Sequence, residues 1–368
     1  MIPFVTSWMC LSSGCFILLS HVLHSKINFS RTHMVVAPTI TTLDVAVDLG
    51  AVSGATVRVE VLQSRPGLLS DISVGLANAS KVRSLMVFFT GNPGLSAFYY
   101  DFIKCLATSN SELDVLVVGY AGHGICELNS PLQQFNLRHQ LSVANQVVQR
   151  FVIDNPCKYL SYYTGGHSIG SYVALKMVTL YPTSFERAFL LTPTICDMAK
   201  SPNGKMNGPL VRSDALSVMA ASVISFAGSI LPESVTQCVI GMSQPGATPT
   251  CKKVISQLSR QNALKNVLYL ARTEFDIVDE LDSIGMKAVA EKLVVVFSKS
   301  DKWVPQSTMD NICNALGVTT INNVQPDGPF PQCVLVPDSN YPHAWCINHS
   351  KVTATDYVLP YIRVSPQL

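Results

Sequence analysis

Continuous apolar runs separated by amphipathic stretches make up most of the chain after residue 80. The runs carry few charges on either face and lie at 84–90, 113–120, 158–164, 186–191, 292–298 and 333–337. Stretches between them, such as 98–106, 132–153 and 169–180, have the apolar spacing of helices, and a last helix is expected from about residue 351. Apolar strands joined by helices are typical of a largely parallel sheet that helices cover on both faces. The pattern therefore predicts an α/β fold.

Two segments before this region alternate between apolar and polar residues instead. They lie at 43–49 and 57–61, and Gly50, Ser53 and Gly54 interrupt the alternation. A period of two indicates strands with one buried face, and the glycine-rich break indicates a turn. We expect an antiparallel hairpin that leads into the sheet.

The stretch from Thr194 to Glu291 contains no short apolar strand and interrupts the rhythm. Within it, residues 215–232 carry no charged side chain and are about long enough to cross the apolar core of a bilayer. A buried helix, a helix inserted at a membrane interface and a membrane span are the three interpretations that remain open. We expect residues 197–290 to form a helical, hydrophobic cap, because insertions between late strands of such sheets cover the site.

The first 40 residues have no place in this pattern. Residues 1–25 contain no Asp, Glu, Lys or Arg, but a signal peptide's basic start is absent and no clear cleavage site follows. A membrane-associating segment, a cleaved signal and a dispensable start all remain open. The expected division is a hydrophobic segment of uncertain role at 1–40 and one α/β domain at 41–366.

One motif predicts chemistry. Gly166-x-Ser168-x-Gly170 follows an apolar strand and begins a helix, which is the setting of a nucleophile elbow. There a serine takes a strained backbone conformation that exposes its hydroxyl group, and the small residues on either side let strand and helix approach. We expect Ser168 to be a catalytic nucleophile.

A serine nucleophile needs an acid that orients its base, and in this arrangement the acid follows the serine in the chain. Asp301 comes directly after the apolar run 292–298, where a strand ends in a loop. Asp276 and Asp279 also follow Ser168, but they fall within the expected cap. Asp301 is the preferred acid, with an ordinary turn or helix-capping aspartate as the alternative interpretation.

The base is expected after the acid. His343 lies on the loop that follows the run 333–337, and His349 lies closer to the last helix. His343 is the preferred base, and His349 remains as a second candidate or as a capping residue. The earlier histidines, which precede the acid, are expected in a turn, on a helix face and in packing at the elbow; they are His123, His139 and His167.

Acyl transfer also needs two hydrogen-bond donors where negative charge develops on the substrate oxygen. The backbone N–H of Ile169, directly after the nucleophile, is the first. The second is expected in Gly91-Asn92-Pro93-Gly94, after the run 84–90, where Asn92 is preferred and Gly94 is the reserve. A simple turn is the alternative interpretation of this segment.

Composition and charge narrow the range of possible functions and ligands. The net charge is only +2, so binding of nucleic acid by bulk charge is excluded. Charged residues make up 14% of the chain, against roughly 25% in ordinary domains, so either the core is large or some surface meets something other than water. No phosphate-binding loop, no His-Glu-x-x-His and no Cys-x-x-Cys occurs. We expect no metal and no cofactor, and the cysteines are interpreted as buried free thiols.

Several segments together resemble the lipid droplet-associated hydrolase family of serine hydrolases. They lie in order at 91–99, 121–123, 166–172, 201–204, 301–305 and 342–345. The resemblance implies an α/β-hydrolase fold with a triad of Ser168, Asp301 and His343. It also implies a hydrophobic cap, a location at lipid droplets and the endoplasmic reticulum, and activity on lipid esters such as sterol esters.

Three functional hypotheses follow. The first is a carboxylic ester hydrolase that acts on lipids at a droplet or membrane surface. The second is an acyltransferase or thioesterase that uses the same acyl-enzyme. The third is a protein that organises the droplet surface and keeps weak or vestigial hydrolase activity. Oligomeric state and acyl-chain preference are not encoded in any pattern that we recognise.

Overall fold

The chain folds around one eight-stranded sheet in the computed structural model, which describes residues 37–47, 55–74, 84–124, 133–259, 263–319, 321 and 324–363. The strands are β1 (Thr39–Val47), β2 (Ala55–Gln63), β3 (Ser84–Phe89), β4 (Leu113–Val118), β5 (Ser161–His167), β6 (Arg187–Leu191), β7 (Leu293–Ser298) and β8 (Gln332–Val336). Their spatial order is β1-β2-β4-β3-β5-β6-β7-β8. The first two are antiparallel to each other and to β4, and the pairs from β4 to β8 are parallel.

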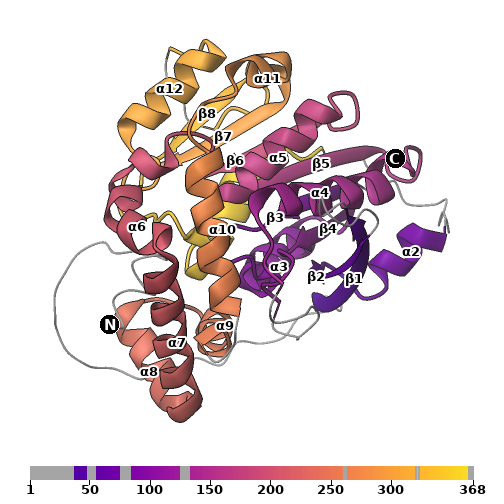
Figure 1. Cartoon of the computed structure of the whole chain (residues 1–368). Helices are drawn as coiled ribbons and strands as arrows, with labels where there is room; N and C mark the ends of the chain where they lie inside the picture. The colour runs from indigo at the N-terminus through magenta and orange to yellow at the C-terminus, as the bar shows by residue number, and fades with distance from the viewer. Residues whose placement is uncertain are drawn as a thin grey trace, which may run out of the picture.

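Helices lie on both sides of this sheet (Figure 1). Those associated with the sheet are α2 (Leu68–Val74), η1 (Ser96–Tyr99), α3 (Tyr100–Ser109), α4 (Leu137–Val148), η2 (Gln149–Ile153), α5 (Ile169–Leu180), α12 (Gln306–Leu316), η5 (Trp345–Ile347), α13 (Ser350–Val352), η6 (Thr353–Val358) and η7 (Leu359–Tyr361). The predicted α/β architecture, a mostly parallel sheet covered by helices, is therefore confirmed.

The core consists of two apolar clusters, one on each face of the sheet. In β3 the side chains alternate between them: Met86 and Phe88 belong to one cluster, and Leu85, Val87 and Phe89 to the other. All six residues of β3 are buried, as are all six of β4 and of β7. Burial on both faces explains why these strands are continuous apolar runs instead of alternating ones.

The N-terminal hairpin is present as predicted, since β1 and β2 pair along their whole length. One predicted strand was misplaced. The run 158–164 begins with a turn, in which the Lys158 N–H donates to the Asn155 carbonyl, and β5 starts only at Ser161. The strand continues through Gly165 and Gly166, which pair in register with Phe88 and Phe89. Glycine by itself disfavours a strand, so the pairing with β3 keeps these two residues in it.

Helices fill the chain between β6 and β7. They are η3 (Met198–Lys200), α6 (Pro202–Arg212), α7 (Asp214–Ile230), α8 (Glu233–Ser243), α9 (Pro249–Ser259), α10 (Ala263–Ile277), α11 (Ser283–Ala288) and η4 (Ala290–Lys292). We call this segment the insertion. In Figure 1, α7 and α8 form its outer part, and α10 lies between α7 and the sheet.

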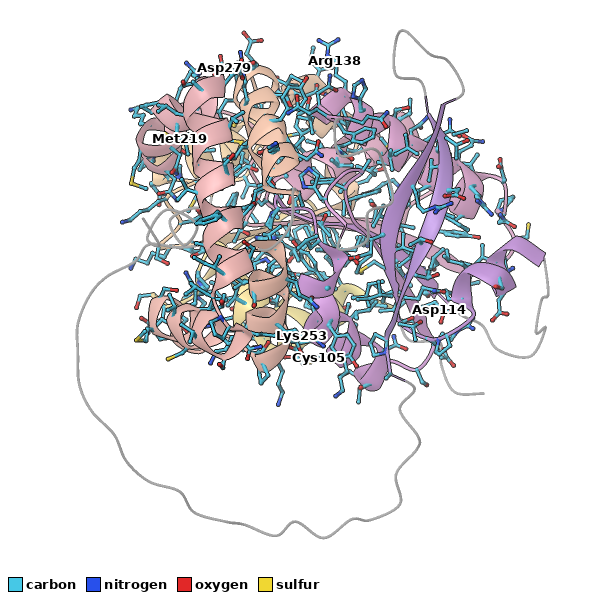
Figure 2. The ribbon with its side chains drawn as sticks, turned by 60° about the horizontal axis from the view of Figure 1, so that its bottom comes forward. Cys105, Asp114, Arg138, Met219, Lys253 and Asp279 are labelled. Atoms are coloured by element: carbon cyan, nitrogen blue, oxygen red, sulfur yellow. The ribbon has the colours of Figure 1, made fainter. Side chains whose placement is uncertain are left out.

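The interpretation of residues 215–232 as a buried helix is wrong. Only Ala221 and Gly228 of α7 are buried, whereas Met219, Phe226 and Ile230 are 56, 67 and 62% exposed. Met219 marks the outer side of α7 in Figure 2. No single helix of the described ranges is long and apolar enough to cross a membrane; α6 and α7 meet that criterion only as a pair bent by 93°.

Some predictions fall outside the described residues. Most of the N-terminal segment 1–40 does so, up to residue 36, and so do the turn residues Gly50, Ser53 and Gly54.

Candidate active site

Ser168 occupies the sharp turn between β5 and α5. Its backbone has φ 56° and ψ −123°, a region that non-glycine residues avoid because it is strained. A Cβ on Gly166 would overlap the Gly170 carbonyl, and a Cβ on Gly170 would overlap the carbonyl of Phe89 on β3. The two glycines are therefore required by close backbone approach, and the turn presents the serine hydroxyl at the carboxyl end of the sheet.

A hydrogen-bonded chain links this hydroxyl to the two other predicted residues. The Ser168 Oγ lies 2.8 Å from His343 Nε2, and His343 Nδ1 lies 2.6 Å from Asp301 Oδ2. Asp301 lies beyond β7 and His343 beyond β8, so the carboxyl ends of three parallel strands bring them together. With Nδ1–H donating to the carboxylate, Nε2 is the acceptor for the serine proton.

The Asp301 carboxylate is held on both oxygens. Its Oδ2 accepts from His343, and its Oδ1 accepts from the backbone N–H groups of Trp303 and Val304, at 2.7 and 3.1 Å. Its side chain has no exposed surface. These bonds fix the carboxylate and, through it, the plane of the imidazole.

The alternative residues lie elsewhere. Asp276 is exposed on α10, and Asp279 forms an ion pair with Lys200. The His349 Nδ1 contacts its neighbour Asn348 and its Nε2 faces Asp338. None of the three takes part in the chain of contacts around Ser168.

The loop after β3 lies against the nucleophile. A Cβ on Gly91 would come within 3.2 Å of the Ser168 Cβ. The reserve donor Gly94 is already used, because its N–H donates to the Gly91 carbonyl at 2.7 Å. Ile169 is the first residue of α5, where backbone N–H groups lack partners within the helix. Asn92 and Ile169 are thus the candidate donors that flank Ser168.

Sequence reasoning assigned His167 only to packing, but it connects two site loops. Its Nδ1 accepts from the Tyr99 hydroxyl at 2.6 Å, and Tyr99 in turn accepts from the Gly91 N–H. Its Nε2–H donates to the His343 carbonyl at 2.8 Å. Burial lowers the pKa of His167 to about 3, so the ring is neutral at physiological pH. The neutral tautomer holds the base loop to the loop after β3.

The other early histidines have local roles. His123 Nδ1 contacts the Pro93 carbonyl at 2.7 Å, which supports the loop after β3, and burial lowers the pKa of His123 to about 4. His139 completes a capping box with Asn136 at the start of α4. These positions agree with the predicted turn and helix-face roles.

Ser168 opens into a small, mainly apolar cavity. Its volume is about 40 Å³. Apolar residues from the insertion and from the loops line it, among them Phe98, Met198, Trp303, Ala344 and Ile347.

One residue of this cavity was missed from the sequence. Glu274 of α10 is fully buried and lines the cavity, and burial raises its pKa to about 8. Its spacing was a usable signal, because Val267, Leu270, Ala271 and Glu274 follow the i, i+3, i+4, i+7 pattern of one helix face. An acidic residue on the apolar face of a helix is expected to be buried, and a buried acidic group is a candidate for a functional role.

Among the described residues, no three His, Cys, Asp or Glu side chains are grouped so that they could hold a metal ion. The described cysteines are free thiols. Five of them are buried, and Cys157 and Cys238 are exposed, contrary to the expectation of burial.

Comparison with known proteins gives a consistent result. The family model described as "Lipid-droplet associated hydrolase" matches residues 82–346. The chicken protein Lipid droplet-associated hydrolase is 30% identical over 286 residues, which cover 74% of this chain and 82% of the relative. The Dictyostelium discoideum protein of the same name is 25% identical over 313 residues, covering 83% and 91% of the two chains.

Solved structures show the same fold at much lower identity. A bacterial membrane phospholipase A superposes with a TM-score of 0.54 at 11% identity, over 86% of this chain and 84% of its own. The thioesterase domain of the curacin biosynthetic pathway gives 0.53 at 11% identity, over 86% and 98%. Identity this low carries the fold alone, which is that of the α/β-hydrolases.

Proposed function

Because the chain belongs to the lipid-droplet-associated hydrolase family, we propose that it is a serine hydrolase that cleaves carboxylic esters of lipids at the droplet surface. Sterol esters are the substrate class within this proposal. The observation that carries it is the contact chain of Ser168, His343 and Asp301 on a strained turn between strand and helix.

The first half of the reaction forms an acyl-enzyme. The Ser168 Oγ attacks the ester carbonyl while His343 Nε2 takes its proton, and Asp301 stabilises the imidazolium that results. The developing oxyanion accepts hydrogen bonds from the backbone N–H groups of Ile169 and Asn92. His343 then gives its proton to the departing alcohol oxygen, and the C–O bond of the ester breaks.

The second half releases the fatty acid. His343 takes a proton from a water molecule, whose oxygen attacks the acyl carbonyl, and the proton is returned to Ser168 as the acyl–serine bond breaks. An alcohol or a thiol in place of water would give an ester or thioester product. Product analysis with a sterol or glycerol acceptor present separates hydrolysis from transfer.

The outer face of the insertion supports the assignment to a lipid surface. Met219, Val223, Phe226 and Ile230 follow each other at helical spacing on α7 and are all exposed. Exposed apolar surface of this extent on one helix is typical of membrane-contacting faces. The endoplasmic reticulum membrane, the second location that the resemblance implies, offers the same kind of surface.

A fluorophosphonate probe tests the nucleophile, because it reacts covalently with activated serines. The wild-type protein should be labelled and Ser168→Ala should not. Hydrolysis of a soluble short-chain ester and of an emulsified sterol ester should both fall by about 10⁶ in kcat in Ser168→Ala. An unlabelled but correctly folded wild type would favour a droplet-organising protein with a vestigial site.

A further inference from the structure

The helix α10 of the insertion contacts the loop that holds the proposed oxyanion donor. The side-chain amide Nδ2 of Asn92 donates to the Val267 carbonyl at 3.0 Å and to Glu274 Oε1 at 3.3 Å, and both partners lie on α10. Asn266, on the same helix, donates to the Gly122 carbonyl at 3.2 Å. One helix of the insertion thus binds the two loops that follow β3 and β4.

The Glu274 carboxyl group is poorly satisfied for a buried acid. Its Oε1 accepts from Asn92, while its Oε2 has no hydrogen-bond partner among the described residues and no exposed surface. Leaving a buried polar atom without a partner costs about 1–3 kcal/mol. An apolar side chain would therefore fit this part of the fold better than a carboxyl group.

We propose that Glu274 is a positioning residue, which fixes the Asn92 side chain and thereby aims the Asn92 backbone N–H at the oxyanion. The site is then complete only while α10 is docked. This inference rests on the proposed function, because it assigns Glu274 a role in the acyl transfer at Ser168. Glu274 itself need not touch the substrate.

The chemical state of Glu274 suits this role at neutral pH. Burial raises its pKa to about 8, so the group is mainly an uncharged acid that accepts from Asn92 through Oε1. A carboxylate here would place negative charge against Asn92, whose backbone N–H is the proposed donor to the developing oxyanion. Ionisation above pH 8 should therefore slow the chemical step.

The groups that face Glu274 do not titrate in the same range. Burial raises the pKa of Tyr120 well above its ordinary value and lowers the pKa of His123 to about 4. Charged residues on α10 and on the elements packed against it lie toward the surface. Lys200 pairs with Asp197 and Asp279, Arg272 pairs with Asp214, and Lys252 is half-buried; the exposed ones are Arg138, Lys205, Arg212, Lys253, Lys265 and Asp276. His343, which lines the same cavity, serves as the base.

The test uses the full chain, a soluble short-chain 4-nitrophenyl ester, and two variants of Glu274. Glu274→Leu removes the acceptor, and Glu274→Gln keeps it without a titratable group. The matched controls are Glu280→Leu and Glu280→Gln, since Glu280 is exposed just beyond α10. Fluorophosphonate labelling of the wild type at Ser168 is the reference: its failure contradicts the proposed function, independently of any Glu274 result.

Glu274→Leu should lower kcat by about 10- to 100-fold with little change in KM, the size expected when a donor is displaced by a fraction of an ångström. Its thermal unfolding midpoint should equal or exceed that of the wild type, because an unsatisfied carboxyl group is removed. Glu274→Gln should keep most of the activity and lose the decline of kcat above pH 8. The Glu280 variants should match the wild type in all three readouts.

A double-mutant cycle tests the contact between Asn92 and Glu274 by changing Asn92 as well. Asn92→Ala removes the side-chain link but keeps the backbone N–H, and combined with Glu274→Leu it should cost no more than the larger single effect. Wild-type kcat in Glu274→Leu, additive losses in the cycle, or a kcat loss that merely follows a lower unfolding midpoint would each overturn the inference.

Discussion

Apolar residues are buried in the sheet but largely exposed on the outer helix α7 of the insertion. Every residue of β3, β4, β5 and β7 is buried, whereas α7, which is just as poor in charge, buries only Ala221 and Gly228. The apolar side chains of the strands pack against the helices on both faces of the sheet. Hydrophobicity in α7 remains exposed on the molecule as it stands.

The two regions also differ in how their polar groups are held. Around Ser168, hydrogen bonds connect the loops that follow β3, β5, β7 and β8, and removing one partner leaves another group buried and unpaired. The outer face of α7 has no such dependence. We therefore expect substitutions in the first region to abolish folding or activity, and substitutions in the second to change only where the protein binds.

The largest expected effect in the sheet region is on chemistry. Asp301→Asn keeps the shape of the side chain but replaces the carboxylate that selects the Nδ1–H tautomer of His343. We expect kcat for a soluble ester to fall by about 10⁴ while the protein remains folded. Steady-state kinetics measure this. A loss of less than tenfold would mean that Asp301 does not orient the base.

The next effect is on stability. Gly170→Ala would drive a methyl group into the Phe89 carbonyl at the crossing of α5 and β3, so it should cost more than about 4 kcal/mol or prevent folding. Gly241→Ala on α8 is the matched control, because its Cβ would meet only the flexible end of Lys252. It should stabilise the protein by about 0.5–1 kcal/mol. Denaturant unfolding compares the two, and equal effects would contradict the contrast between regions.

The buried His167 predicts a pH effect of intermediate size. Because its folded pKa is about 3, below the ordinary 6.5, its contribution to stability is complete above pH 6.5 and is lost as the pH falls. His167→Gln should be less stable than the wild type at pH 7, and this deficit should shrink by about 1–2 kcal/mol at pH 5. Urea titrations at both pH values measure it. His349→Gln, at a half-buried histidine, should show a smaller change.

The smallest effect belongs to the outer face. The double variant Phe226→Ser and Ile230→Ser should reduce binding to triolein droplets coated with phospholipid by about tenfold, since each exposed side chain inserts only in part. Soluble-ester kinetics and unfolding should stay unchanged. Leu160→Ser with Leu180→Ser is the control, because these exposed leucines lie at the opposite end of the sheet. Equal losses of droplet binding in the two double variants would show that α7 is not a specific droplet-binding face.

The sequence predicted those parts of the fold in which local pattern and tertiary environment agree. The strands around Leu85, Val115 and Val295 are buried at every position and are mainly apolar, because both of their faces are covered. The end of β5 was predicted three residues too early, at Thr164 instead of His167, because pairing with β3, and no local propensity, keeps Gly165 and Gly166 in the strand. The exposure of α7 could not be predicted either, since a buried helix and an interfacial one have the same composition.

For the site, the sequence by itself determined the residue types and their order. It placed a serine between small residues at a strand end, an aspartate and a histidine after later strands, and a Gly-Asn-Pro-Gly segment after an early one. Parallel strands end at one edge, so order along the chain was enough to suggest proximity. Only the tertiary structure decided that Gly94 is already bonded, that His167 joins two loops, and that Glu274 meets Asn92. Glu274 and Asn92 lie far apart in the chain, and no local pattern records which side chain of a helix face reaches which loop.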